Sequence, residues 1–543
     1  MTPAVRCASP LLSLGRWPRR GIAVAAGAAS VLAMAPFFLW PVLFLTLPVL
    51  VWLIDAELAN AKRRPVAHAA AIAWWFAFGY FLAGLFWIGE AFLVEAEKFA
   101  VLMPFAVLMM PAGLALFWAG AAAAASLAWQ PDWRRILALG LAIAAAEWLR
   151  GHVLTGFPWN VLGYALTAPD VMMQSAAILG IYGLTLIAVP LFAAPLVVWR
   201  DTRAEAPGAA GDTTAPMLAV LAALVPLAAM AGWGALRLAS PLSTPADAIN
   251  IRLVQPSIPQ REKWQRENQR RNFERHLELT TRNPAGTPDG AKDVQLIVWP
   301  EAAMPFLPLE TPAALDMIAE AVPETAHLVA GILRVESPPT DLAGARRRVL
   351  NSLAAFGPDG RPVRMYDKTH LVPFGEYLPF QQTLEAIGLE QLTRIRGGFD
   401  VGPTPRPLLR IPGLPALGPL ICYEAIFPGT VVQGAERPAA LLNVTNDGWF
   451  GNTTGPRQHL HQARVRAVEE GLPVIRSANN GISAIIDARG QIVARLELDV
   501  IGVLDGRLPG ALPPPIYARF GDLAFALLWL AGLAYLLAQH FRR

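Results

Sequence analysis

Long apolar runs fill most of the chain before residue 239, and they limit the possible folds more than any other feature. A helix needs about 20 consecutive apolar residues to cross a bilayer, and a helix satisfies its own backbone polar groups there. The runs predict seven spans, near residues 21–37, 39–55, 66–89, 99–127, 135–153, 172–199 and 216–237. The first two are short and share a break at Pro36 and Pro41, so a hairpin or one broken element remains open.

A polar region follows the apolar half. The composition becomes mixed and polar from residue 239 to about residue 515, and a last apolar run covers residues 523–538. We therefore expect four parts along the chain: an N-terminal tail (1–20), seven transmembrane helices (21–238), a water-exposed domain (239–515), and a final span with a short tail (516–543).

The charges that flank the predicted spans indicate the orientation. The loop near residues 90–98 is acidic, whereas basic clusters flank several of the other predicted span ends. With seven spans before the polar region, these clusters fall on one side, which the positive-inside rule assigns to the cytoplasm. Arg150 and His152, on the other side, weaken the bias without reversing it. The basic residues are Arg6, Arg16, Arg19, Arg20, Lys62, Arg63, Arg64, Arg134, Arg135, Arg200, Arg203, Arg542 and Arg543.

Composition excludes several classes of function. The net charge is only +4 and the basic residues form no single stripe, so nucleic acid is not expected as a partner. Cys7 and Cys422 are the only cysteines, which rules out a disulfide framework and a cysteine zinc site. His459 and His461 are two residues apart on a predicted helix and point apart, so no metal site is expected there.

The polar region alternates between short β-rich runs and polar helical segments. Turn residues bound most of the runs, and a hairpin is predicted at 481–496. Helices are predicted at 261–282 and 456–470, the latter ended by Gly471. This pattern is typical of an α/β domain whose strands are buried on both faces. The predicted strands are 249–258, 294–301, 326–335, 349–357, 419–424, 439–447 and 472–479.

Three predicted strand ends carry reactive side chains. Glu301 ends "LIVWPE", Lys368 lies in "YDKTHLVPFGEYLPF", and Cys422 follows the strand in "GPLICYE". A thiol is mostly protonated at neutral pH, so a cysteine nucleophile needs a base or a nearby cation. Glu301 could take the proton, and Lys368 could stabilise a thiolate and an oxyanion. These residue types suit acyl transfer through a thioester, although their spacing leaves open whether they meet.

Other interpretations of these residues remain. Cys422 could be an inert core thiol, and Glu301 and Lys368 could form a structural ion pair. A membrane-tethered amidase would use the same three residues but would not explain eight spans. A non-catalytic scaffold or transporter has no reason to keep all three residues, and a transporter should show more polar residues along its spans.

The motifs resemble a known group of enzymes. "WPE", "YDKTHLVPFGEYLP" and "CYE", in this order, are similar to the Glu–Lys–Cys signatures of the nitrilase superfamily. The resemblance extends over essentially the whole chain to the bacterial apolipoprotein N-acyltransferase family. It is carried further by "APFFLWP", "GFPWNVLGY", "LVQPSIPQREKW", "NVTNDGWFGNTTGPRQHLHQARVRAVE" and "RSANNGISAIID".

This resemblance implies an αββα domain on the periplasmic face of the bacterial inner membrane. It also implies transfer of a fatty acyl chain from a phospholipid, through a cysteine thioester, to the α-amine of the diacylglyceryl-cysteine of an apolipoprotein. No metal or soluble cofactor is implied, and the expected partners are these two lipid substrates and the bilayer. A monomer is expected.

The resemblance also implies roles for particular residues. Cys422 matches the nucleophile, Glu301 the general base and Lys368 the residue that stabilises the oxyanion. Further matches are three supporting residues, Glu376, Tyr423 and Glu424, and three residues expected to line the lipid entrance, Trp264, Trp449 and Phe450. The asparagines Asn443, Asn446 and Asn452 are expected only to cap or turn the chain.

Overall fold

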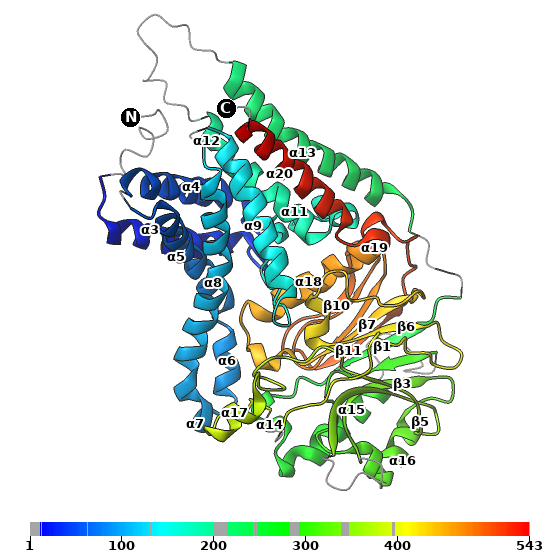
Figure 1. Ribbon diagram of the computed structural model, residues 1–543. Helices are drawn as coiled ribbons and strands as arrows, with labels where there is room; N and C mark the ends of the chain where they lie inside the picture. Colours follow the sequence, from blue (N-terminus) through cyan, green and yellow to red (C-terminus); the bar gives the residue numbers. More distant parts are fainter. Residues whose placement is uncertain are drawn as a thin grey trace, which may run out of the picture. The chain divides into compact units, whose positions relative to one another are not determined.

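The computed structural model describes most of the chain (Figure 1). The described residues are 11, 13–61, 63–130, 132–198, 214–242, 245, 247–282, 293–337, 347–393 and 397–541. Several residues used above lie outside this part of the chain, namely Arg6, Cys7, Lys62, Arg200, Arg203, Arg542 and Arg543. The chain divides into two units. The membrane unit comprises residues 1–86, 104–240 and 514–543. The other comprises residues 87–103 and 241–513 and is called the catalytic unit because it contains the candidate residues Glu301, Lys368 and Cys422.

Helices occupy every predicted span of the membrane unit. The main ones are α3 (Arg16–Ser30), α4 (Leu43–Asn60), α5 (Pro65–Leu85), α8 (Met103–Leu127), α9 (Arg134–His152), α11 (Ala176–Ala193), α13 (Thr214–Ala239) and α20 (Leu523–Phe541). Shorter helices are α10 (Asp170–Met173), α12 (Pro195–Val198) and α19 (Ile516–Phe520). Helix α3 begins at Arg16, inside the predicted tail, and the break before α4 separates two helices.

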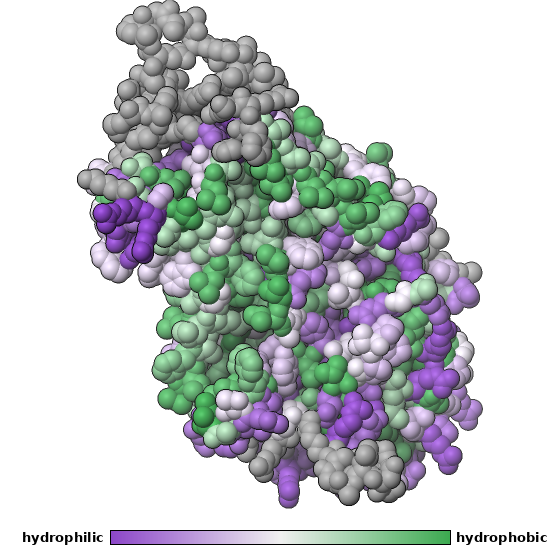
Figure 2. All heavy atoms as spheres, viewed as in Figure 1, coloured by the Kyte–Doolittle hydropathy of each residue, from purple (hydrophilic) through white to green (hydrophobic). Residues whose placement is uncertain are grey.

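Within the described residues, four helical stretches are long and apolar enough to cross a membrane, so the chain is a membrane protein. They are Trp40–Asn60, Pro65–Leu85, Ala96–Leu127 and Ala176–Ala193. The full set of eight spans stays a prediction. Along α8 the side chains of Phe105, Leu108, Met109 and Leu116 are exposed. Figure 2 shows apolar residues gathered over this helix, as a lipid-facing surface requires.

Glycines allow α3 and α5 to touch. A Cβ atom on Gly27 would lie 1.9 Å from the carbonyl oxygen of Phe76, and one on Gly79 would lie 2.2 Å from that of Val24. Because lipid tails give helices no hydrophobic reason to associate, such close approach provides the packing energy instead.

In its described residues, the catalytic unit contains two β-sheets. One has the order β11-β1-β2-β3-β4-β5 and the other β10-β9-β8-β7-β6. Strands β1, β2 and β3 are parallel to one another, as are β6, β7 and β8. The first sheet comprises β1 (Asn250–Gln255), β2 (Leu296–Val298), β3 (His327–Glu336), β4 (Arg348–Phe356), β5 (Pro362–Asp367) and β11 (Gly502–Arg507). The second comprises β6 (Leu417–Ile421), β7 (Ala440–Thr445), β8 (Val474–Ala478), β9 (Ser483–Ile486) and β10 (Ile492–Leu496).

Side chains on both faces of the sheets are buried. Leu253 of β1 and Val444 of β7 belong to one core cluster that joins the two sheets. The next residue, Val254, belongs to a second cluster with residues of α15 and α16, because successive side chains of a strand face opposite sides. A third cluster joins the second sheet to α18. The predicted αββα arrangement is therefore confirmed. The helices of the catalytic unit are α6 (Ile88–Leu93), α7 (Ala96–Phe99), α14 (Gln260–Lys263), α15 (Gln269–Thr281), α16 (Pro312–Ala321), α17 (Gln381–Ala386) and α18 (Gly455–Glu470).

Each predicted strand contains an observed strand, and the predicted hairpin is the antiparallel pair β9–β10. Two strands were missed, β5 and β11. Both lie at a sheet edge and are mostly not buried, so their sequences lack a continuous apolar run. The helix predicted at 261–282 was wrong in its continuity, because the chain turns between α14 and α15.

Candidate active site

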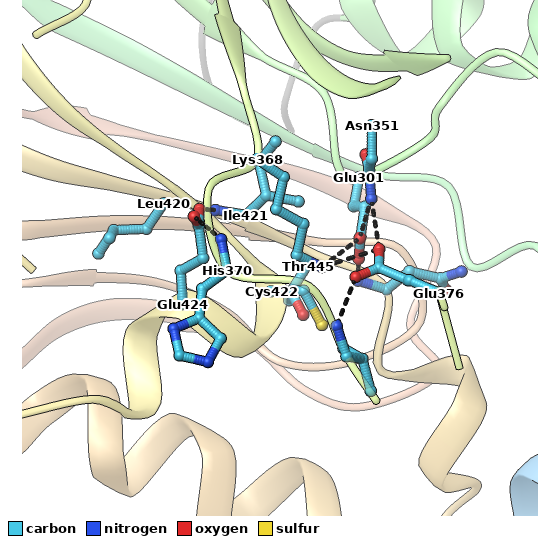
Figure 3. A network of polar contacts seen from close by, with 12 residues as sticks. Glu301, Asn351, Lys368, His370, Glu376, Leu420, Ile421, Cys422, Glu424 and Thr445 are labelled. Atoms are coloured by element: carbon cyan, nitrogen blue, oxygen red, sulfur yellow. Dashed lines mark hydrogen bonds and ion pairs between the residues drawn. The ribbon is translucent and has the colours of Figure 1, made fainter. Parts of the chain in front are cut away.

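The structure brings the three reactive strand ends together. Glu301 follows β2, Lys368 directly follows β5, and Cys422 directly follows β6 at the start of a short 3-10 helix, η7 (Cys422–Ile426). Figure 3 shows their side chains in one cluster, although they come from both sheets. The question that the spacing left open is answered: the three residues meet.

A buried ion-pair cluster forms the centre of the site. The Lys368 Nζ atom lies 3.0 Å from Glu376 Oε1 and 3.6 Å from Glu301 Oε1. Asn351 of β4 donates from Nδ2 to both carboxylates, at 2.9 Å each. Burial disfavours the ammonium, but the carboxylates of Glu376 and Glu301 outweigh it and raise the pKa of Lys368. Lys368 is therefore charged at neutral pH.

Backbone donors fix the two carboxylates. Glu376 Oε2 accepts a hydrogen bond from the Val372 N–H at 2.8 Å. Glu301 Oε2 accepts one from the Asn446 N–H at 3.0 Å. Each carboxylate therefore has one oxygen held by the backbone, and its other oxygen faces Lys368.

Cys422 combines burial with a strained backbone. Its relative exposure is 7%, and its φ of +50° is in the left-handed region, which non-glycine residues seldom adopt. Strain of this kind, typically about 1–3 kcal/mol, persists where the surroundings hold it, often at active sites. Burial and the Glu301 carboxylate raise the pKa of the Cys422 thiol, and Lys368 only partly opposes them. The resting residue is a neutral thiol that needs a base.

Glu424 links the segment that carries Cys422 to the one that carries Lys368. Its carboxylate is completely buried. Burial alone would raise the pKa of Glu424, but Arg406 and the Ile421 N–H outweigh it and lower that pKa. The donors to this carboxylate are Tyr366 Oη (2.7 and 2.8 Å), Thr369 N (2.9 Å) and Oγ1 (2.8 Å), His370 N (3.1 Å), Arg406 Nη2 (3.2 Å) and Ile421 N (2.7 Å).

Comparisons with known proteins agree with this geometry. The family model of the carbon-nitrogen hydrolases matches residues 250–511, and that of the apolipoprotein N-acyltransferase N-terminal domain matches residues 26–194. The apolipoprotein N-acyltransferase of Rhodopseudomonas palustris is 48% identical over 526 residues, which cover 96% of this chain and 95% of that protein. That of Bradyrhizobium diazoefficiens is 47% identical over 522 residues, covering 96% and 95%. The chain belongs to the apolipoprotein N-acyltransferase family.

Among solved structures, an amidase from Nesterenkonia sp. matches 53% of this chain and 98% of its own, with 19% identity and a TM-score of 0.35. That likeness is too weak to bear on function. The family membership and the two sheets described above identify the catalytic unit as a nitrilase-superfamily domain.

The residues that the family resemblance assigned to site support and to the lipid entrance lie in several places. Tyr423 is buried, and its ring lies 4.9 Å from that of Phe427. Trp264, at the end of α14, is 41% exposed. Trp449 and Phe450 lie in the 3-10 helix η8 (Asp447–Phe450) after β7, where Phe450 packs on Trp87 with ring centres 4.5 Å apart. A role of Trp264, Trp449 and Phe450 in lipid binding stays a prediction.

Several residues of this site were not predicted from the sequence. Lys263, next to Trp264, donates from Nζ to the Glu301 carbonyl oxygen at 3.0 Å, and burial lowers its pKa to about 8. Asn446 was expected only to cap or turn the chain, and this was wrong. Its N–H binds Glu301, and its Nδ2 donates to Gln260 Oε1 at 2.7 Å.

Asn351 was also missed, although a polar side chain inside the apolar strand "VLNSL" was a signal, since buried polar groups need partners.

His459, considered from the sequence only as half of a metal-binding pair, places Nδ1 2.9 Å from Asp447 Oδ1. Within the described residues, no group of three or more His, Cys, Asp or Glu side chains is placed to hold a metal ion.

Proposed function

We propose that this protein transfers a fatty acyl chain from a membrane phospholipid to the N-terminal α-amine of the diacylglyceryl-cysteine of apolipoproteins. The acyl chain is carried as a thioester on Cys422. The observation that carries the proposal is the cluster at the strand ends, where Lys368 lies 3.6 Å from Glu301 beside a neutral, strained cysteine. Family membership supports the choice of substrates.

In the first half-reaction, the Glu301 carboxylate takes the proton of the Cys422 thiol. The thiolate attacks the ester carbonyl of the phospholipid, and the Lys368 ammonium stabilises the oxyanion that forms. The C–O bond to the glycerol then breaks. Glu301 returns the proton to the leaving oxygen, so the products are a lysophospholipid and an acylated Cys422.

In the second half-reaction, the neutral α-amine of the lipoprotein attacks the thioester. Glu301 takes a proton from the attacking nitrogen, and Lys368 again stabilises the oxyanion. The C–S bond breaks, the amide forms, and the proton on Glu301 returns to the sulfur. Glu376, Glu424 and Tyr423 support the site: Glu376 holds Lys368, whereas Glu424 fixes the segments on either side.

The location follows from the flanking charges. The basic clusters between predicted spans support an N-terminal tail in the cytoplasm and a catalytic unit in the periplasm, in an inner membrane crossed eight times. Both substrates are lipids, so an enzyme tethered to the bilayer meets them without extracting them into water. We propose that it acts there as a monomer and without a cofactor.

The test is intact mass spectrometry of the full-length protein in detergent with added phospholipid. The wild type should gain the mass of a fatty acyl group, and hydroxylamine should remove it because thioesters are cleaved by that nucleophile. Cys422→Ala should gain nothing. Cys7→Ala is the matched control, because it removes the only other thiol and should keep the adduct.

A second stage identifies the acceptor. A synthetic peptide with a diacylglyceryl-cysteine and a free α-amine should remove the acyl group from the enzyme, and the same peptide with an acetylated amine should not. No adduct on the wild type, or an adduct that survives in Cys422→Ala, would contradict the proposal. Hydrolysis of small amides without transfer to the peptide would indicate an amidase instead.

A further inference from the structure

A buried histidine contacts the backbone of the cysteine. His459, on the first turns of α18, places Nε2 3.1 Å from the Cys422 carbonyl oxygen. Its other ring nitrogen, Nδ1, lies 2.9 Å from Asp447 Oδ1 and 3.2 Å from Arg476 Nη2. Arg476 also donates from Nη2 to Asp447 Oδ2 at 2.8 Å. All three side chains are essentially inaccessible to water.

Donor and acceptor chemistry determines where the ring carries its proton. A carbonyl oxygen only accepts, so the contact with Cys422 requires a proton on Nε2. In a neutral ring Nδ1 then accepts from Arg476. In a charged ring Nδ1 donates to Asp447, which is ionised because Arg476 and His459 overcome burial and hold its pKa at about 2. The bond to Cys422 is kept in both states.

This bond acts on a strained part of the chain. Cys422 has a φ of +50°, which a β-carbon disfavours. On the N-terminal side, the Ile421 N–H donates to Glu424 Oε2 at 2.7 Å. On the C-terminal side, the Cys422 carbonyl accepts from His459. The backbone around the thiol is therefore held on both sides by buried side chains, on one side by Glu424 of the same 3-10 helix and on the other by His459 of α18.

The ring of His459 is itself fixed from several elements. Asp447 belongs to η8, Arg476 to β8 and Cys422 to η7, and the ring of Phe450 lies 6.0 Å from that of His459 at 68°. Thr445 donates from Oγ1 to Asp447 Oδ1 at 2.9 Å, which holds the carboxylate in turn. A side chain with so little freedom can transmit its position to the residue it binds.

We propose that His459 is a positioning residue for Cys422. It donates from Nε2 to the Cys422 carbonyl and holds the strained backbone that aims the thiol at Glu301 and Lys368. Asp447 and Arg476 set the ring. The inference rests on the proposed function only in taking Cys422 as the nucleophile.

The experiment measures how fast iodoacetamide alkylates Cys422 in the full-length protein in detergent, with Cys7 replaced by alanine throughout. His459→Met removes the donor and should slow alkylation about tenfold, equivalent to about 1.4 kcal/mol. His459→Gln can place an amide N–H near the position of Nε2 and should restore most of the rate. His461→Met is the matched control, since His461 is a buried histidine on the same helix, near the charges of Arg464 and Arg466.

A second readout uses phospholipid as the acyl donor. For His459→Met the saturating rate of adduct formation should fall with alkylation, and the half-saturating phospholipid concentration should stay unchanged. Equal losses in His459→Met and His461→Met, or wild-type rates in His459→Met, would overturn the proposal. If His459→Met does not fold, His459→Gln is compared with His459→Asn, whose shorter amide cannot reach. Equal alkylation rates in these two variants would then overturn it.

The alkylation rate requires no acyl donor. It therefore separates failure of this inference from failure of the proposed function, in which the wild type would gain no acyl adduct at all.

Discussion

The two units each contain a buried ion pair, and the pairs differ in what surrounds them. In the membrane unit, Arg150 of α9 binds Glu147 and the carbonyl oxygens of Phe157 and Trp159, the last at 3.0 Å. Trp118 donates to Glu147 at 2.6 Å. In the catalytic unit, the partners of Lys368 among the described residues are the carboxylates of Glu301 and Glu376, next to a thiol. The Arg150 guanidinium binds backbone carbonyl oxygens and so stabilises a loop. The Lys368 ammonium can contact a new negative charge.

The largest effect should come from removing the proposed base, Glu301. Glu301→Gln keeps the size of the side chain and its contact with the Asn446 N–H but cannot take the thiol proton. We expect acyl-adduct formation to slow about 10³-fold, within the range typical of general bases. The measurement is the rate of mass gain with phospholipid. A rate within tenfold of the wild type would mean that another group takes the proton.

A reciprocal pair of substitutions sharpens the comparison. Lys368→Arg keeps the charge but replaces a compact ammonium by a planar fork. Because the oxyanion contact is then misplaced, we expect adduct formation to slow about 10²-fold. The unfolding temperature, followed by tryptophan fluorescence, should fall much less in Lys368→Arg than in a variant that lacks a charge at this position. Adduct formation at the wild-type rate would show that charge alone is needed at this position.

Arg150→Lys is the other half of the pair. A lysine keeps the charge but has a single nitrogen, so it cannot reproduce the contacts that Arg150 divides between Nη2, which binds Glu147, and Nη1, which binds the two carbonyl oxygens. We expect a loss of about 2 kcal/mol in the free energy of unfolding, as for lost hydrogen bonds of a charged group. The rate of adduct formation per folded molecule should be unchanged. Slower adduct formation without a loss of stability would show that the Arg150 pair, like the Lys368 cluster, affects the reaction itself.

An effect of similar size is expected for Asp447, a buried carboxylate of the catalytic unit that, like Glu147, is paired with a buried arginine. Its pKa is lowered from 3.8 to about 2, so it stabilises the fold above pH 4 and loses that contribution as the pH falls toward 2. The contribution is about 2 kcal/mol at neutral pH. Unfolding curves of the wild type and Asp447→Asn in detergent should differ at pH 7 and approach each other as the pH falls from 4 toward 2. Parallel curves would show that Asp447 is not held as an ion.

Much of this structure was accessible from the sequence, for identifiable reasons. Apolar runs located the helices of the membrane unit, and short runs bounded by turn residues located the buried strands. Glu301 and Cys422 stood out because each follows an apolar strand, and Lys368 stood out because it lies in the run "YDKTHLVPFGEYLPF". The edge strands β5 and β11 escaped because exposed strands need no apolar pattern.

The missed site residues act across elements. Asn351 lies inside β4 and reaches carboxylates that follow β2 and β5, while His459 on α18 reaches the residue after β6. Which side chains of different elements face each other depends on sheet order and packing, and a single sequence does not give these. Burial of a polar residue in an apolar run is the only local sign, and it names no partner.

The segment 87–103 has a practical consequence for anyone who wants the catalytic unit alone. It comes from between two apolar helices of the sequence, yet it belongs to the catalytic unit, where Trp87 donates to Gln458 at 3.2 Å and packs on Phe450. A Cβ atom on Gly455 would lie 3.0 Å from the Trp87 ring. A soluble fragment cut at residues 241 and 513 would therefore lack one of its own pieces and expose an unfilled apolar surface beside α18. Expression of the unit on its own calls for grafting this segment, not only for trimming the membrane helices.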